Sequence, residues 1–315
     1  MDILGLIIYP GLTFLLALAW FYEWLDRRFS TGMHSKDGPI CFDWHGLLQS
    51  LTDFARLLAK EVMAPRVVGK PILTGLPILI LTLPLIALFL VPMGGIGSLV
   101  NFEGDLIFAV VIMGFLAILI FIDERSSANR SSAVDDFRAA VRTLHCEVLL
   151  VTAALGPAIA AGSLSISRIV QWQATNGLWI FFLTPIGFSI AVLAVIAELE
   201  KVPFDISQVE TGTIAGWRAE FLGRRLALVR LVHDLELVLT AALLTDLFLG
   251  GPSGPISIIP GIIWFLIKAT PIVLFLSKLR VLFNRFRIGQ MISALWKHLM
   301  VLAILQVIIL RLLFW

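Results

Sequence analysis

The chain of 315 residues is 59% hydrophobic and 15% charged, with a mean hydropathy of +0.96, which excludes an ordinary soluble enzyme. Its formal net charge of +2 gives no reason to expect nucleic-acid binding. The two cysteines, Cys41 and Cys146, show no CxxC spacing, so the sequence supports no disulfide framework, zinc site or iron–sulfur cluster.

Eight apolar runs are long enough, or nearly long enough, to cross a bilayer as helices, which takes about 20 residues. None alternates apolar and polar residues as a membrane-spanning strand would. We therefore predict an all-α, polytopic membrane protein forming one domain over residues 1–315, with the first run retained as a span. The runs are Ile3–Tyr22, Ile72–Pro92, Leu106–Ile122, Val148–Ile166, Leu178–Ala197, Leu226–Leu249, Ile256–Leu276 and Leu299–Trp315.

Lysine and arginine are concentrated in alternate connections between these runs. The connections at about 26–71, 123–147, 198–225 and 277–298 carry 20 of the 24 basic residues, whereas the other three carry only Arg168. By the positive-inside rule, the basic connections face the cytoplasm, and both termini lie on the outer side of the cell membrane. Anionic lipid and a partner protein account for this bias.

The first basic connection contains HGLLQSLTDFARLLAKE, in which leucines and Phe54 recur at helical spacing between polar residues. This pattern predicts an amphipathic helix on the cytoplasmic side, lying at the membrane interface, packing against the bundle, or both.

Ionisable residues lie within or beside several runs, where their burial is costly and often functional. Lys201 is close enough in sequence to pair with Glu198, and Arg230 with Asp234 or Glu236. Two interpretations stay open: the acids form a proton or ion path, or they form ion pairs that fix the packing. The candidates for the path are Glu147, Glu198, Glu200, His233, Asp234 and Glu236, and further charges lie at Asp246 and Lys268.

Pro203 follows the fifth run directly and disfavours helix at the preceding residue. The run should therefore end there, before an ordered loop rich in acidic residues at the membrane surface.

The segment AELEKVPFDISQVE and three other stretches resemble the NuoH family of respiratory complex I, also called NADH dehydrogenase subunit 1, which includes relatives in membrane-bound hydrogenases. The resemblance covers almost the whole chain. Its matching positions include Ala197-Glu198, Pro203-Phe204-Asp205, Glu210 and Glu220; Asp26-Arg27-Arg28, Lys36 and Gly46-Leu47-Leu48-Gln49; Arg138-Ala139-Ala140 and Glu147; and Arg280, Arg285-Phe286-Arg287 and Trp296-Lys297.

This resemblance implies an eight-helix subunit that anchors a hydrophilic redox arm and passes energy to antiporter-like membrane subunits through buried acids. Asp205, Glu210 and Glu220 would form an acidic coupling loop. The residues expected to dock the arm are Arg27, Arg28, Lys36, Arg280, Arg285 and Arg287. The iron–sulfur clusters, and a nickel–iron centre where there is one, would belong to partner subunits. No redox centre is expected in this chain, which we interpret as a non-catalytic subunit.

Several positions depart from the complex I pattern. Gln208 and Gly212 replace acids of the coupling loop, and His233 replaces an acid of the sixth run. These departures favour a ferredoxin-linked branch of the hydrogenase or sulfane sulfur reductase type, which couples electron transfer to H⁺ or Na⁺ movement without quinone. The alternative is the quinone-chamber subunit of NADH:quinone oxidoreductase. A transporter acting alone and a structural anchor are further alternatives, although the chain shows no duplicated half.

Overall fold

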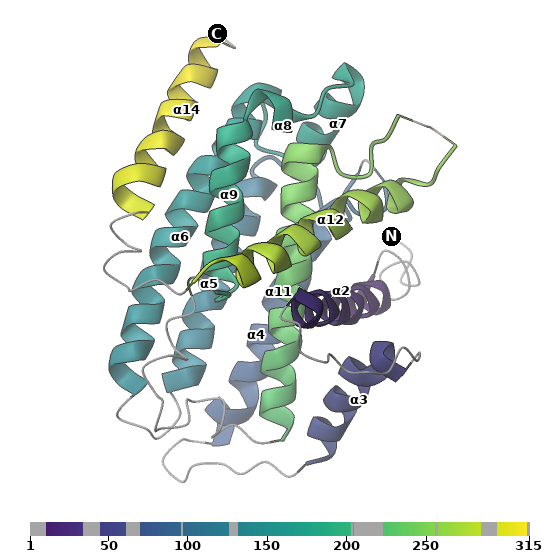
Figure 1. The fold of residues 1–315 in the computed structure, drawn as a ribbon, viewed down its shortest axis with the longest axis vertical. Helices are drawn as coiled ribbons and strands as arrows, with labels where there is room; N and C mark the ends of the chain where they lie inside the picture. The colour runs from purple at the N-terminus through teal and green to yellow at the C-terminus, as the bar shows by residue number, and fades with distance from the viewer. Residues whose placement is uncertain are drawn as a thin grey trace.

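The computed structural model describes residues 11–33, 45–60, 70–95, 97–125, 132–202, 204, 223–255, 258–284 and 295–313, and these contain helices and turns without a strand (Figure 1). The helices are α2 (Leu12–Met33), α3 (His45–Ala59), α4 (Lys70–Leu90), α5 (Asp105–Arg125), α6 (Ser132–Ala161), α7 (Ile166–Asn176), α8 (Ile180–Leu183), α9 (Pro185–Glu198), α11 (Arg224–Leu249), α12 (Gly261–Leu282), the π-helical η1 (Leu295–Met300) and α14 (Val301–Leu313).

This architecture confirms the predicted all-α, polytopic class. Four helical segments in the described part of the chain are long and apolar enough to cross a membrane: Asp105–Asp123, Thr143–Ala161, Gly261–Leu282 and Trp296–Leu313. Gly75–Leu90 and Pro185–Glu198 are shorter apolar helices. The first predicted run corresponds to α2, although its residues 3–10 lie outside the described residues.

The fifth run was wrongly predicted as one continuous helix. It divides into α8 and α9 at Thr184, because Pro185 has no N–H to donate and disfavours helix at the residue before it. The chain also forms α7, an eleven-residue helix that we did not predict between the fourth and fifth runs.

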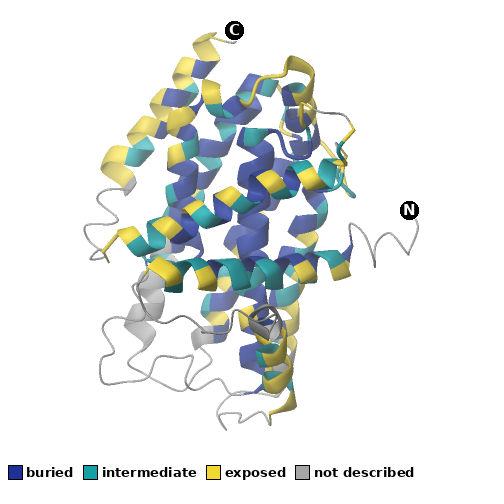
Figure 2. Cartoon of the chain, turned by 45° about the vertical axis from the view of Figure 1, so that its right-hand side comes forward, coloured by how far each residue is buried: buried dark blue, intermediate teal, exposed yellow. Residues whose placement is uncertain are grey.

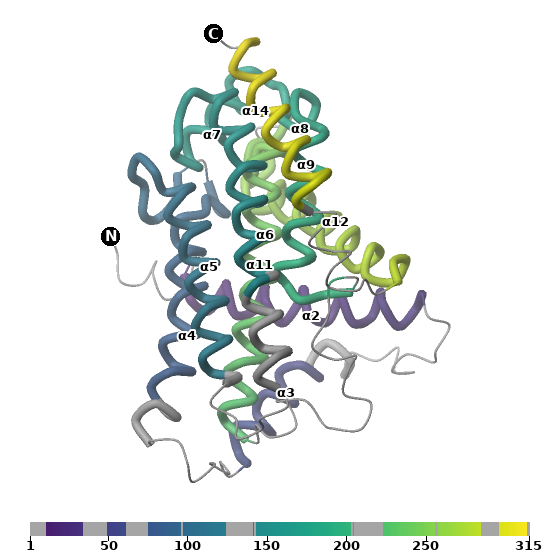
Figure 3. The backbone as a smooth tube through the Cα atoms, turned by 90° about the vertical axis from the view of Figure 1, so that its left-hand side faces the viewer, coloured from purple at the N-terminus to yellow at the C-terminus, as the bar shows by residue number. Residues whose placement is uncertain are grey.

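Helices α4, α5, α6, α9 and α11 run roughly along the long axis, whereas α2 and α12 pack together and cross this bundle at a steep inclination (Figures 1 and 3). We call the end formed by α3, the end of α5 and the start of α11 the basic end, and the end formed by α7 and the Gly250–Pro255 turn the opposite end. Helix α14 lies on one flank, against α6 and α9.

Helix α11 forms the centre of the bundle and is buried over most of its length (Figure 2). Its second half, residues 237–249, is apolar apart from Asp246 and two threonines, and a helix that is apolar on nearly all sides is buried among other helices. The outer faces of the bundle are apolar too, and α14 exposes Leu305, Ile308 and Ile309. Such extensive exposed apolar surface is suited to lipid.

The amphipathic helix predicted in the first connection is α3, and it packs on the bundle. It contacts α2 and α11. The rings of Phe54 and Trp20 lie 6.2 Å apart, while Leu51 stays exposed. The Arg224 side chain joins α11 to α3 by donating to the carbonyl of Leu58 at 3.2 Å.

A buried ion pair joins α5 to α11 near the basic end. Arg225 Nη2 lies 2.5 Å from Asp123 Oδ1 and donates to the Asp123 carbonyl at 2.9 Å, and both side chains are almost completely buried. Removing one partner of a buried pair is costly, because the remaining charge loses its compensation in a medium of low dielectric constant.

We predict that Asp123→Ala lowers the free energy of unfolding by about 3–5 kcal/mol, because buried Arg225 loses its carboxylate partner. Thermal unfolding of the purified protein in detergent measures the loss. The double variant Asp123→Leu with Arg225→Met removes both charges and should recover most of the stability. Equal stability of the single variant and the wild type would contradict this role.

Candidate functional site

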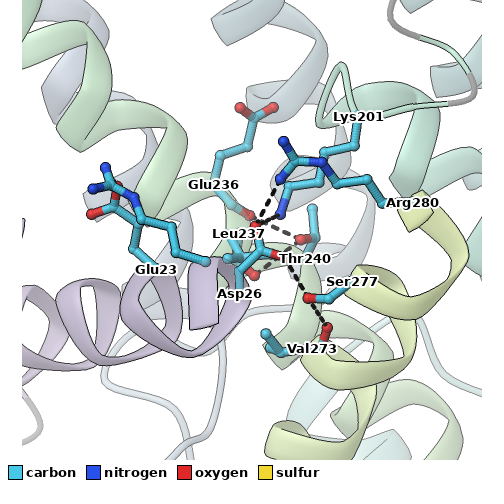
Figure 4. Close-up of polar contacts among 10 residues, drawn as sticks. Glu23, Asp26, Lys201, Glu236, Leu237, Thr240, Val273, Ser277 and Arg280 are labelled. Carbon is cyan, nitrogen blue, oxygen red and sulfur yellow. Dashed lines mark hydrogen bonds and ion pairs between the residues drawn. The ribbon is translucent and has the colours of Figure 1, made fainter. Parts of the chain in front are cut away.

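The Asp26 carboxylate brings together three segments that are distant in the sequence (Figure 4). Lys201 Nζ, in the turn after α9, donates to Asp26 Oδ2 at 2.9 Å, and Arg280 Nη1, on α12, approaches the same oxygen at 3.2 Å. The Ser277 hydroxyl donates to Asp26 Oδ1. We call Asp26, Lys201, Ser277 and Arg280 the Asp26 cluster.

Asp26 lies beyond Tyr22, where the predicted first span ends, and is only 6% exposed. Burial alone would raise the pKa of Asp26. The Lys201 ammonium, the Ser277 hydroxyl and the Arg280 guanidinium outweigh that effect and hold the pKa below its ordinary value. Asp26 is therefore a fixed negative charge at neutral pH, and two cations depend on it.

The turn that carries Lys201 follows from the end of α9. The helix ends at Glu198, as expected shortly before Pro203, and Glu200 adopts a left-handed backbone conformation with φ of 51°. The Lys201 N–H donates to the carbonyl of Ile196 at 3.2 Å, and the buried Phe204 donates its N–H to the Lys201 carbonyl at 2.9 Å. This local geometry holds the Lys201 backbone, so that its side chain reaches α2.

The structure shows a partner for Lys201 that was not predicted, because its ammonium group binds Asp26. Sequence reasoning missed this partner because Asp26 and Lys201 lie 175 residues apart in the chain. The available signal was the acidic residue before Arg27-Arg28, which matched the family motif but was left out of the candidate path.

A second cluster of polar side chains lies between α2, α3 and α11, around a narrow cavity that has room for about one water molecule. Glu23, Arg27, Asp53, Arg230 and Asp234 line it. Arg27 pairs with Glu23 one turn away and lies 3.8 Å from Asp53 Oδ2. The cavity thus gathers both signs of charge beside the Asp26 cluster.

The other candidates of the acidic path lie on several helices. Glu198 is buried at the end of α9, and Glu200 is half-buried in the turn that follows. Glu236 is buried on α11, 3.4 Å from Nδ1 of His233. In Figure 4, Glu236 lies on α11 beside the Asp26 cluster, and its carboxyl group points away from Asp26.

Glu147 is half-buried on α6, facing α5 at Gly114. A Cβ placed on Gly114 would lie 2.0 Å from the Glu147 carboxyl carbon, so only glycine leaves room for this side chain in its present position. Position 114 was not identified from the sequence, where one glycine among many apolar residues gives no signal.

The residues predicted to dock a redox arm are only partly described. Arg27 and Arg280 form the intrachain contacts above while remaining partly exposed, and Arg28 lies 5.1 Å from the Trp24 ring. The predictions that lie outside the described residues are Lys36, Asp205, Glu210, Glu220, Arg285 and Arg287. Within the described part of the chain, no group of three His, Cys, Asp or Glu side chains could hold a metal ion.

We predict that Asp26→Asn lowers the free energy of unfolding by about 2–3 kcal/mol at neutral pH, since Lys201 and Arg280 lose their shared charge. Because the folded-state pKa of Asp26 is lowered, its stabilisation is present above the unfolded value of about 3.9 and is lost as the pH falls through the folded value. The difference between variant and wild type should therefore close in acid.

Unfolding in detergent between pH 8 and pH 3 measures this difference. Glu103→Gln removes the acid of an exposed pair with Arg168 and serves as the control, with little expected effect. A gap between Asp26→Asn and the wild type that widens in acid would contradict the assigned sign.

Comparisons with known proteins bear on almost the whole chain. A family model described as NADH dehydrogenase matches residues 6–311. The chain is 32% identical over 303 residues to the H subunit of NADH-quinone oxidoreductase from Carboxydothermus hydrogenoformans, covering 95% of this chain and 85% of that protein. It is 31% identical over 306 residues to the corresponding protein of Geobacillus sp. (strain WCH70), covering 95% and 91% of the two chains.

Proposed function

Because the chain belongs to the NADH dehydrogenase family, we propose that it is the quinone-contacting membrane subunit of an NADH-quinone oxidoreductase and couples quinone reduction to ion movement. The observation that carries this proposal is the likeness to H subunits of that enzyme over 95% of the chain. It favours the alternative of the sequence analysis, because these relatives do not support the hydrogenase-type branch that we had expected.

The Asp26 cluster suggests how an event at the basic end reaches the bundle. Lys201 holds the start of the segment that continues into Asp205 and Glu210, where the redox arm is predicted to dock. A movement of this segment that withdraws Lys201 would leave Asp26 with less positive charge around it. The change would act on Asp234 and Glu236 on neighbouring α11, since Coulomb interactions are strong at low dielectric constant.

In this proposal, protons cross the bundle along a path of four acids, Glu147, Glu198, Asp234 and Glu236. Glu200 and His233 lie at the edge of this path. The basic end faces the cytoplasm, where Lys36, Arg285 and Arg287 complete the docking surface. Iron–sulfur subunits and antiporter-like membrane subunits are the partners. The positive-inside bias and the half-buried or buried positions of the acids support this arrangement.

The quinone-independent branch stays as the second candidate, because Gln208 and Gly212 stand where quinone-linked relatives are expected to carry acids. In that case a ferredoxin would deliver electrons indirectly and the hydrophilic arm would resemble a nickel–iron hydrogenase.

Purification of the whole complex through a tag on this chain separates the two candidates. We expect NADH oxidation that depends on added quinone, together with iron–sulfur subunits in the preparation. Nickel in the complex, with ferredoxin-dependent hydrogen formation and no quinone reduction, would overturn the proposal in favour of the second candidate.

The coupling role predicts a separation of two activities. In reconstituted vesicles, Glu147→Gln and Glu236→Gln should each lower ion movement per quinone reduced by about tenfold or more, while assembly is retained. Glu103→Gln, an exposed acid, is the matched control. Unchanged ion movement in both variants would indicate that these two acids only stabilise the packing of the helices.

A further inference from the structure

Lys268 caps the C-terminus of α11 at the opposite end of the bundle. Its Nζ on α12 donates to the carbonyls of Leu249 at 2.7 Å, Gly251 at 3.0 Å and Ser253. An ammonium group has three N–H donors, so these carbonyls use its full capacity. The carbonyl ends of α11 also favour a cation there, through the helix dipole.

Asp246 lies on α11 one turn before that cap and is completely buried. Neither carboxyl oxygen has a hydrogen-bond partner among the described residues. The carboxyl group lies against the backbone of Gly251, since a Cβ built there would be 2.3 Å from Asp246 Oδ1. Gly251 is in turn one of the residues whose carbonyl holds Lys268.

The groups around Asp246 give an ionised carboxylate little compensation. Lys268 is the charged side chain that acts on it, and its donors are already occupied. From α7, the facing residues are the uncharged Gln173, which donates to the backbone carbonyl of Asp246 at 2.9 Å, and Val170 beside Gly251. A buried carboxylate without hydrogen bonds costs several kcal/mol, so a protonated carboxyl group fits this site better.

A groove at the opposite end reaches the same turn. It is lined by Gln173, Trp179, Ser253, Gly254 and Trp264, among others. Trp179 lies 5.4 Å from the Lys268 ammonium, and Ser253 is one of its acceptors. The Lys268 cap thus separates the Asp246 carboxyl group from the groove.

We propose that Asp246 and Lys268 form a proton-binding switch at the opposite end of the bundle. With the proton bound, Asp246 is neutral and Lys268 holds the three carbonyls of the turn. When the carboxyl O–H bond breaks, the proton passes to water in the groove, and the Lys268 ammonium moves from the carbonyls to the new carboxylate. The Gly250–Ser253 turn then loses its cap and opens.

The switch needs no electron donor or acceptor, because only a proton is exchanged. That it serves ion movement rests on the proposed function, whereas the switch itself can be tested without quinone or NADH.

Two measurements on the intact complex test the switch, with Asp246→Asn as the variant and Glu103→Gln as the control. Asparagine has nearly the same shape as aspartate, so the fold should be retained. Infrared spectroscopy at pH 7 should show the band of a protonated carboxyl group, identified by its shift in D₂O. This band should be present in the wild type and in Glu103→Gln and absent from Asp246→Asn. A band that Asp246→Asn retains, or its absence from the wild type, would overturn proton binding at Asp246.

Hydrogen–deuterium exchange, corrected for intrinsic rates, tests the movement of Lys268. The peptide that contains Gly250–Ser253 should lose protection at high pH in the wild type and in Glu103→Gln, and should stay protected at all pH values in Asp246→Asn. The switch is refuted by equal protection of wild type and variant across the pH range, whatever the quinone reductase activity of the complex.

Discussion

The buried negative charge of Asp26 is the constraint on which the basic end of the molecule depends. Helices α2 and α12 cross the main bundle, so they cannot share the long parallel contacts that fix α6 against α9. The Asp26 carboxylate joins them through Ser277 and Arg280, and it joins both to the turn after α9 through Lys201. The position of α2 in turn sets the polar cavity against α3 and α11.

Polar side chains also fix helix ends elsewhere in the apolar bundle. Arg225 binds both the carboxylate and the backbone carbonyl of Asp123 near the end of α5. Gln173 donates to two carbonyls at the end of α11 and accepts the N–H of Ile180 at the start of α8. Buried backbone groups without hydrogen-bond partners are costly in hydrocarbon, and these side chains supply partners at the helix ends. The same contacts hold loops and short helices against the long helices.

Apolar runs predicted the helices well, because length and hydropathy are local properties of the sequence. The break at Thr184 was readable in Pro185, although the uninterrupted hydropathy hid it. Helix α7 was missed because its sequence ISRIVQWQATN is too polar and too short for a span. Single acids within the runs were also visible, since ionisable residues stand out in apolar sequence.

The pairing of those charges was not predictable in the same way. Lys201 has Glu198 and Glu200 as sequence neighbours, yet it binds Asp26 on another helix. Only the packing of α2 beside α12 brings that carboxylate within reach. The branch of the family was also hard to predict. We based it on single positions such as Gln208 and Gly212, and these are weaker evidence than the likeness to relatives along the whole chain.

The contact between Glu147 and Gly114 has an evolutionary consequence. The carboxyl group occupies the space of a missing side chain on α5, so a larger residue at position 114 would displace it. A lineage with a larger residue at position 114 would therefore carry Glu147 in another orientation, or a shorter residue at position 147. Covariation between these two positions in related sequences would therefore record whether this acid has been retained in its present location.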